Sequence, residues 1–143
     1  RTRFVSRDRL WQGADLGGLG VASFGHLGGV HMQNFDTWDP YRQAIAKGEV
    51  PLARAYRPSA DERLIRELVL QMKRGKVRPG YFQDKYGVDI RARFEGPLLS
   101  LTRDGWLARC DAEEVALTRD ALLRVDVLLQ RFFLPEHSGI RYT

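Results

Sequence analysis

Cysteine is nearly absent from this sequence, since Cys110 is the single one among 143 residues. One cysteine forms no internal disulfide and supplies no multi-cysteine metal site. A chain without disulfides is typical of a reducing compartment, so we expect a cytoplasmic protein. Cys110 alternates with Trp106 and Ala108 along an expected strand. We therefore predict that it lies in the core, where a free cysteine behaves as a small apolar residue.

Long apolar runs are also absent. No stretch approaches the roughly 18 apolar residues of a membrane-spanning helix, and none has the character of a signal peptide. We therefore expect no membrane partner and no export. With 43% hydrophobic and 29% charged residues, the composition is that of an ordinary folded chain. The first residue is Arg1 rather than methionine, so we expect a fragment or a processed product of a longer protein.

The excess of one charge sign is small. Lys and Arg number 23 and Asp and Glu 18, which gives a net charge of +5. Residues 73–78, a Lys-Arg-Gly-Lys-Val-Arg run, are the densest basic segment. Such a run is most often a solvated helix end, where cations also suit the helix dipole. Alternatively, Arg74 and Lys76 bind substrate carboxylates. A net charge of this size does not by itself indicate nucleic acid.

Glycine, by contrast, is concentrated near the start of the chain. Residues 18–34 read GLGVASFGHLGGVHMQN, with glycines around a short apolar run and a polar Gln33 and Asn34 at the end. A core strand gains nothing from so many glycines, because each costs conformational entropy and packs no side chain. This density indicates that the backbone passes very close to another strand, a sharp turn or a ligand.

Residues 1–57 are predicted to contain little periodic structure. Apolar runs at residues 4–5 and 19–24 favour short strands, and residues 36–48 have the start and stop signals of one helix. Residues 49–57 are expected to be a connector. Because this part lacks enough periodic structure for a core of its own, we expect it to be the end of a larger upstream domain.

Residues 58–143 show clearer periodicity. Ser59 and Glu62 have capping-box spacing, and apolar residues then recur at helical intervals up to Gly75. The further elements expected are a helix over 79–86, a helix over 90–103 that kinks or restarts at Gly96 and Pro97, a hairpin of strands 106–110 and 115–117, a helix over 119–133 and an irregular tail, 136–143. This order is that of a winged-helix-like unit. The predicted fold class is therefore α+β, with a domain boundary near residues 57–59.

Four places in the sequence carry a resemblance to one family. They are Leu10 and Trp11 before GLGVASF at 18–24, Gln33 and Asn34 before Tyr41, RLIRELV at 63–69, and DGWL at 104–107 followed by VALT at 115–118 and by Leu122 and Leu123. In this order, and over nearly the whole chain, they resemble the C-terminal part of the oxygen-independent coproporphyrinogen III oxidases. These are the HemN-type radical S-adenosylmethionine enzymes.

The resemblance implies a fold and a chemistry. Residues 1–57 would be the last strands and helix of the radical S-adenosylmethionine catalytic domain, the end of an incomplete α/β barrel. Residues 58–143 would be the family's mostly helical C-terminal domain, which covers the substrate cleft. Such enzymes hold a 4Fe-4S cluster on a CxxxCxxC loop and reduce S-adenosylmethionine to a 5′-deoxyadenosyl radical. A cluster needs several thiolates, so we expect the cluster and the catalytic residues to lie upstream of this chain.

The resemblance also implies partners and binding residues. The partners would be a tetrapyrrole substrate, either porphyrinogen or haem, and the upstream catalytic part of the same protein. The glycine-rich strand would line the barrel, where family members bind a second S-adenosylmethionine. The residues expected to contact that molecule are Gly18, Gly20, Val21, Ala22 and Phe24.

Two departures from the family pattern add other candidate functions. Phe24 stands where the coproporphyrinogen enzymes have an aliphatic residue, and residues 71–75 lack their Cys-Asn pair. A methyltransferase-like relative or another enzyme of haem metabolism is therefore at least as well supported as the housekeeping enzyme of haem synthesis.

Two further hypotheses come from other functional classes. In a winged-helix nucleic-acid module the helix before the hairpin would read bases, but residues 97–103 are largely apolar and the turn at 111–114 is acidic. A haem-binding chaperone of the same family would use His26, His31 and Met32, since His and Met are haem ligands. The competing interpretation of that stretch is a polar loop with a glycine turn between the two histidines.

Overall fold

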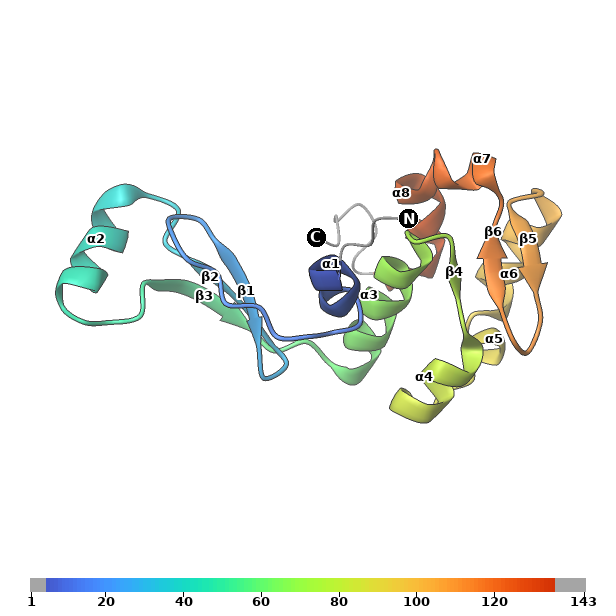
Figure 1. Cartoon of the computed structure of the whole chain (residues 1–143), viewed down its shortest axis with the longest axis horizontal. Helices are drawn as coiled ribbons and strands as arrows, with labels where there is room; N and C mark the ends of the chain where they lie inside the picture. Colours follow the sequence, from blue (N-terminus) through green and yellow to red (C-terminus); the bar gives the residue numbers. More distant parts are fainter. Residues whose placement is uncertain (1–4, 136–143) are drawn as a thin grey trace. The chain divides into compact units, whose positions relative to one another are not determined.

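The structure is a computed structural model that describes residues 5–135 (Figure 1). The chain divides into two compact units, with the boundary between Ala60 and Asp61, and each is considered by itself. Phe4 and residues 136–143 lie outside the described residues, so the expectations for residues 4–5 are tested only at Val5 and those for the tail are not tested. No helix in the described part is long and apolar enough to cross a membrane.

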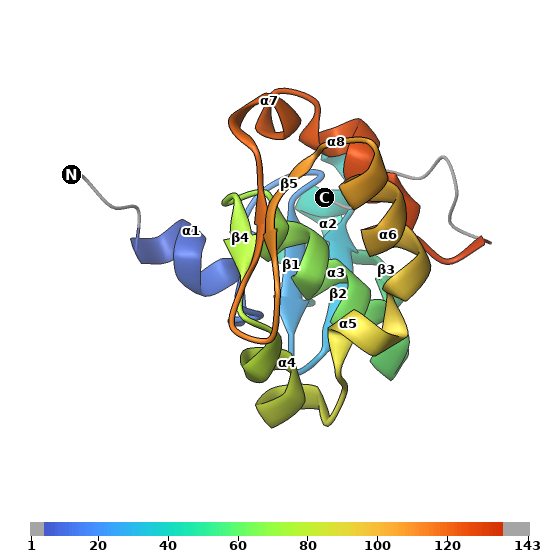
Figure 2. The same cartoon turned by 90° about the vertical axis from the view of Figure 1, so that its right-hand side faces the viewer.

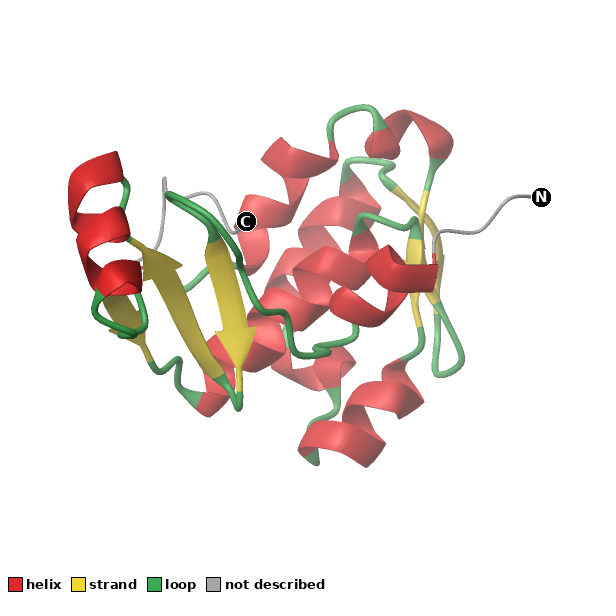
Figure 3. Ribbon diagram, turned by 60° about the vertical axis from the view of Figure 1, so that its left-hand side comes forward, coloured by secondary structure: helices red, strands yellow, loops and turns green. Residues whose placement is uncertain are grey.

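The first unit is built on a three-stranded antiparallel sheet (Figure 3). Its elements are α1 (Val5–Leu10), β1 (Phe24–Leu27), β2 (Val30–Asn34), α2 (Trp38–Ala46) and β3 (Leu52–Tyr56). The strands are ordered β1-β2-β3 and every pairing is antiparallel. An α/β barrel, in contrast, is closed by parallel strands. The position of this sheet at the end of a barrel therefore stays a proposal.

The β1–β2 hairpin follows from its two-residue glycine turn. Gly28 and Gly29 have φ angles of 55° and 78°, the left-handed values that a type I′ turn requires at both central positions. Leu27 therefore pairs directly with Val30, and the register continues to Phe24 opposite Gln33. The predicted glycine turn between the two histidines is confirmed, but the polar loop is wrong, because His26 and His31 lie in the paired strands β1 and β2.

Three local expectations for the first unit are wrong, and one holds. Val5 begins a helix instead of a strand, the run at residues 19–24 becomes a strand only at Phe24, and the expected connector contains β3. Every residue of β3 is exposed. A strand with no buried face needs no alternation of apolar and polar residues, which is the signal by which a half-buried strand is found in a sequence. Pairing with β2 makes it a strand. The helix predicted over residues 36–48 is confirmed as α2, and Gly48 follows it with a φ of 73°.

In the second unit, shorter helices and a small sheet surround one central helix, α3 (Ala60–Met72) (Figure 2). Its other elements are β4 (Lys76–Val77), α4 (Pro79–Tyr86), α5 (Ile90–Arg93), α6 (Glu95–Arg103), β5 (Leu107–Cys110), β6 (Val115–Leu117), α7 (Arg119–Leu122), α8 (Val125–Leu128) and the 3-10 helix η1 (Leu129–Phe132). The sheet has the order β4-β6-β5 and is antiparallel.

The core of this unit forms around the apolar stripe of α3. The stripe predicted from the sequence is buried along its whole length: Leu64, Ile65, Leu68, Val69 and Met72. Phe82 of α4 and Leu101 of α6 are fully buried in the same cluster. The predicted ends are also confirmed, since Gly75 and Gly87 follow α3 and α4 with φ angles of 100° and 68°.

The structure corrects the prediction for Cys110, which is exposed. The strand pairing of β5 shifts between Leu107 and Arg109, so one extra residue interrupts the alternation. Beyond this shift Cys110 pairs directly with the buried Val115, so the bulge does not account for its exposure. Cys110 is the last residue of β5, an edge strand of the sheet, where fewer neighbours cover a side chain.

The remaining differences concern the places where helices are interrupted and one short strand. The expected helix over 119–133 is divided into α7, α8 and η1, because Arg124 leaves helical geometry with a φ of −122°. The restart predicted near Gly96 and Pro97 is confirmed, with the break at Phe94 between α5 and α6. The strand β4 was not expected, since two residues give no periodic signal.

Candidate functional site

The glycine-rich loop that enters β1 is held by the side chain of Asn34. This amide donates from Nδ2 to the carbonyl oxygens of Gly18 at 3.2 Å and Gly20 at 2.9 Å. Asn34 is buried at the end of β2, and its backbone N–H donates to the carbonyl of Ser23. One buried side chain therefore supplies donors to two carbonyls of the loop, of which that of Gly20 also accepts a longer bond, 3.4 Å, from the N–H of Ser23.

A second contact ties the loop to α2. The N–H of Gly20 donates to the hydroxyl oxygen of Tyr41 at 3.2 Å, and the hydroxyl of Ser23 donates to the carbonyl of Leu19 at 2.6 Å. Asn34 and Tyr41 belong to the residues that carry the family resemblance. In this structure they position the loop.

The loop approaches its own strand so closely that a side chain at Gly18 would not fit. A Cβ there would lie 2.3 Å from the carbonyl oxygen of Phe24. Ala22 has a φ of 59°, a conformation that a residue with a Cβ seldom adopts. The close approach predicted from the glycine content is confirmed, and at Gly18 its partner is the backbone of the same chain.

Strand alternation gathers aromatic and polar side chains on one face of the sheet. Cross-strand pairing puts Phe24, Gln33 and Arg54 in one row. The next row holds His26, His31 and Tyr56. The Nε of Arg54 donates to the Oε1 of Gln33 at 2.7 Å.

A shallow groove of about 120 Å³ lies against this face. Its lining includes Phe24, His31, Arg54 and Tyr56. The side chains of Phe24 and Tyr56 are 60% and 55% exposed, so both present aromatic surface. An apolar ring beside a guanidinium suits a flat, partly anionic ligand.

The structure brings the residues expected to contact S-adenosylmethionine into one loop and the adjoining strand. Gly18 and Gly20 lie in the loop clamped by Asn34, Val21 and Ala22 are half-buried in the same loop, and Phe24 opens β1 with an exposed ring. Their contact with the cofactor stays a prediction.

The three residues considered as a haem or metal ligand set do not converge. Met32 pairs with Gly25 and Ala55, which puts it on the face opposite His26 and His31. In the described part of the chain, no group of three or more His, Cys, Asp or Glu side chains could hold a metal ion.

In the second unit, the predicted substrate-binding cations lie on either side of Gly75. Arg74 is exposed, and the Nζ of Lys76 pairs with the Oε2 of Glu114 at 2.5 Å. Lys73 pairs with Asp126 at 2.8 Å. Binding of substrate carboxylates by Arg74 and Lys76 stays a prediction.

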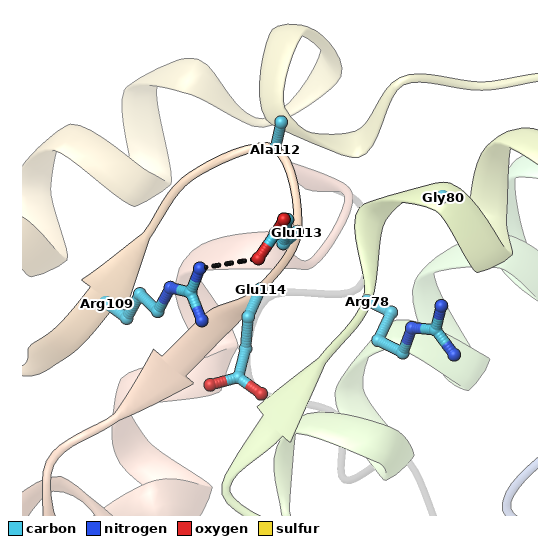
Figure 4. A pocket seen from close by; sticks show the side chains of 6 residues that line it. All are labelled: Arg78, Gly80, Arg109, Ala112, Glu113 and Glu114. Atoms are coloured by element: carbon cyan, nitrogen blue, oxygen red, sulfur yellow. Dashed lines mark hydrogen bonds and ion pairs between the residues drawn. The ribbon is translucent and has the colours of Figure 1, made fainter.

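The tip of the β5–β6 hairpin and the start of α4 border an open groove of about 450 Å³ (Figure 4). Within it, Nη2 of Arg109 pairs with Glu113 at 2.9 Å, and its Nε donates to Asp111. The hydrogen bond from Arg109, with those from the N–H groups of Glu114 and Glu113, lowers the pKa of Asp111. The turn is therefore acidic and its arginine is paired with carboxylates, which disfavours binding of nucleic-acid phosphates.

A buried carboxylate in the second unit was not predicted. Glu67 is 3% exposed, and its Oε1 accepts hydrogen bonds from Nε2 of Gln71 at 3.0 Å and from the hydroxyl of Tyr81. Its Oε2 accepts from Nζ of Lys85 at 2.7 Å and from the hydroxyl of Tyr86 at 2.6 Å. The sequence signal was the pair of polar residues, Glu67 and Gln71, one helical turn apart beside the apolar stripe of α3.

This network shifts the pKa values of its members. Burial, followed by the hydrogen bond to Glu67, raises the pKa of both Tyr81 and Tyr86. For Lys85, burial lowers the pKa, but hydrogen bonds to Glu67 and Tyr81 outweigh it, so the net shift is upward. The arrangement holds a charged Lys–Glu pair between two neutral phenols and links α3 to α4.

Comparison with known proteins supports the resemblance. The chain is 26% identical over 135 residues, 90% of its length, to an oxygen-independent coproporphyrinogen III oxidase of Pseudomonas aeruginosa. It is 31% identical over 85 residues, 59% of its length, to the enzyme of the same name from Helicobacter pylori. The resemblance to HemN-type enzymes is confirmed. No protein-family model matches the chain.

The fold of a solved structure agrees. Coproporphyrinogen III oxidase (HemN) from Escherichia coli, described as a radical SAM enzyme, superposes with a TM-score of 0.71 over 83% of this chain at 19% identity. The chain spans 28% of that protein, and 29% and 19% of the Pseudomonas and Helicobacter relatives. The similarity therefore concerns one part of a longer type of protein.

We predict that Asn34→Ala loosens the glycine-rich loop. The carbonyl of Gly18 loses its donor and that of Gly20 keeps only the 3.4 Å bond from the N–H of Ser23, which should lower the free energy of unfolding by about 1–3 kcal/mol. Urea unfolding measures the loss, and amide exchange at Ala22 should become faster. The exposed neighbour Asp36→Ala is the control, with a change within about 0.5 kcal/mol. Equal effects of both substitutions would contradict the clamp.

Glu67→Ala should destabilise the second unit far more than loss of a surface ion pair. Lys85 and two phenols lose a shared buried acceptor, and breaking such a site costs about 3–5 kcal/mol. Asp61→Ala, on the same helix, removes an exposed pair with Arg93 at 3.0 Å and should cost less than about 1 kcal/mol. Urea unfolding of both variants compares them, and similar losses would show that the network adds no stability.

The raised pKa values predict a loss of stability at alkaline pH. Below about pH 10 the tyrosines are neutral in both states, so their contribution is complete. Above it, the unfolded chain releases protons that Tyr81 and Tyr86 still hold in the folded state, so the free energy of unfolding falls as pH rises. Unfolding measured from roughly pH 8 to 11 should show this decline, and Tyr86→Phe should make it shallower. An unchanged slope in Tyr86→Phe would refute the assignment.

Proposed function

We propose that this chain is the C-terminal part of a radical S-adenosylmethionine enzyme of the coproporphyrinogen III oxidase-like family, acting on a tetrapyrrole. The observation that carries the proposal is the sequence similarity over 135 residues to an enzyme of that name. The shared fold supports it. The parent protein would be an oxidoreductase or, as the departures at Phe24 and residues 71–75 suggest, a methyltransferase.

The 4Fe-4S cluster does not fit the residues of this chain. A cluster is held by several thiolates, and the sequence offers one cysteine, Cys110, which is exposed on β5. No step through the cluster is assigned to these residues. The proposal therefore requires an upstream part of the same protein, and that part is the expected partner of this chain.

S-adenosylmethionine, by comparison, fits the first unit. Its adenine is a flat heteroaromatic group, and Phe24 offers a largely exposed ring beside a shallow groove. Gly18, Gly20, Val21 and Ala22 form the loop next to it. In this proposal the loop and Phe24 bind and orient a cofactor molecule at the edge of the barrel. The barrel-edge position of residues 1–57 is part of the same proposal.

The second unit would cover the substrate cleft as a winged-helix-like domain. Tetrapyrrole substrates of this class carry carboxylates, for which cations are suitable partners. Arg74 is exposed, and Lys76 would exchange its partner Glu114 for a substrate carboxylate. The acidic hairpin turn opposes this exchange, because Glu114 belongs to it and its carboxylates would repel the substrate.

The decisive experiment uses the full-length parent protein. After anaerobic reconstitution with iron and sulfide and reduction of the cluster with dithionite, it should cleave S-adenosylmethionine to 5′-deoxyadenosine and turn over coproporphyrinogen or haem, as followed by chromatography. Decarboxylated product would indicate the oxidase, and methylated product the methyltransferase. A parent sequence without a CxxxCxxC loop, or no cofactor cleavage with any tetrapyrrole, would refute the proposal.

Variants in the same protein test the two binding assignments. Phe24→Ala should raise the KM for S-adenosylmethionine about tenfold, while the similarly exposed Trp38→Ala should leave it unchanged. Arg74→Ala should raise the KM for the tetrapyrrole without altering that for the cofactor. Equal changes in the KM for S-adenosylmethionine in Phe24→Ala and Trp38→Ala would show that Phe24 does not bind the cofactor.

A further inference from the structure

Two histidines face each other across the β1–β2 hairpin. His26 and His31 are directly paired in the strand register and lie on the same face of the sheet. Their Nδ1 atoms are 3.0 Å apart, and their ring centroids are 4.4 Å apart. His26 is 9% exposed and His31 is half-buried, so solvent reaches the pair from the side of His31.

We propose that His26 and His31 together bind a divalent transition-metal ion through their Nδ1 atoms. Imidazole nitrogens bind such ions at about 2.0–2.1 Å, so two of them on adjacent positions of a square-planar or tetrahedral ion lie about 2.8–3.4 Å apart. The observed spacing falls within this range. In the metal-free protein one Nδ1–H donates to the other Nδ1. When the ion binds, that ring changes tautomer and carries its proton on Nε2, so both imidazoles stay neutral and both Nδ1 lone pairs face the ion.

The backbone holds this geometry before any ion binds. The two-residue turn at Gly28 and Gly29 leaves the facing pair only one step from the end of the hairpin. On the other edge of β1, Leu16 and His26 exchange two backbone hydrogen bonds, of 2.7 Å and 2.8 Å. A preorganised pair loses little conformational entropy on binding.

The ligand set defines the type of site. Two imidazoles suit copper, nickel and zinc, and the usual affinity order favours Cu²⁺ over Ni²⁺ and Zn²⁺. No third His, Cys, Asp or Glu joins the pair in the described part of the chain, and Met32 lies on the other face. Water therefore completes the coordination, so the ion is exchangeable, unlike one in a closed four-ligand structural site. The metal proposal does not rest on the proposed function, although His31 also lines the groove beside Phe24.

The test is a titration of the full chain with Cu²⁺, Ni²⁺ and Zn²⁺, each alone. We expect one Cu²⁺ per chain with two imidazole nitrogens in its electron paramagnetic resonance spectrum, and weaker binding of the other two ions. His26→Ala and His31→Ala should each reduce Cu²⁺ affinity at least about tenfold. The third histidine of the sequence gives the control, since His137→Ala should change nothing.

A second measurement guards against loss of folding in these variants. In the unmodified chain, Cu²⁺ should broaden the NMR signals of His26 and His31 before those of His137. Absence of stoichiometric Cu²⁺ binding, earlier broadening of His137, or full affinity in folded His31→Ala would each overturn the proposal.

Discussion

The side-chain amide of Asn34 is the contact on which the first unit's surface depends. Without it, the carbonyl of Gly18 would lose its donor, that of Gly20 would keep only a long bond of 3.4 Å from the N–H of Ser23, and the loop before β1 would lose its fixed path. The loop in turn needs glycine at position 18, because a side chain there would collide with the carbonyl of Phe24. The position of Phe24, and so of the groove beside it, follows from these two constraints.

In the second unit, a buried charged side chain has the same role as Asn34. Glu67 is buried on α3 and gathers Lys85 and the two phenols from α4, whereas Asn34 gathers backbone carbonyls. Burial of a side-chain amide costs little free energy when both of its N–H donors are used. A carboxylate must have several partners to offset the free energy of its desolvation. In both units a single polar side chain connects elements that apolar packing alone would hold less specifically.

Strand alternation divides the chemistry of the hairpin between two faces. It separates Met32 from His31 and so removes the three-residue ligand set suggested by the sequence. It also brings His26 opposite His31 and Phe24 into the row of Arg54. The candidate cofactor surface and the proposed metal pair are therefore neighbours on one face. Residue composition suggested the participants, but only the register decided which of them meet.

Local signals in the sequence were sufficient for α3 to α6 of the second unit, for the β5–β6 hairpin and for the family resemblance, but not for the division of residues 119–133 into α7, α8 and η1. The stripe from Leu64 to Met72 and the glycines that follow α3 and α4 act through neighbours in the chain, so the sequence alone determines them. Tertiary structure decided that β3 is a strand, that Cys110 is exposed at the end of an edge strand and that Glu67 gathers its partners. Each of these depends on pairing between residues far apart, which no local pattern records.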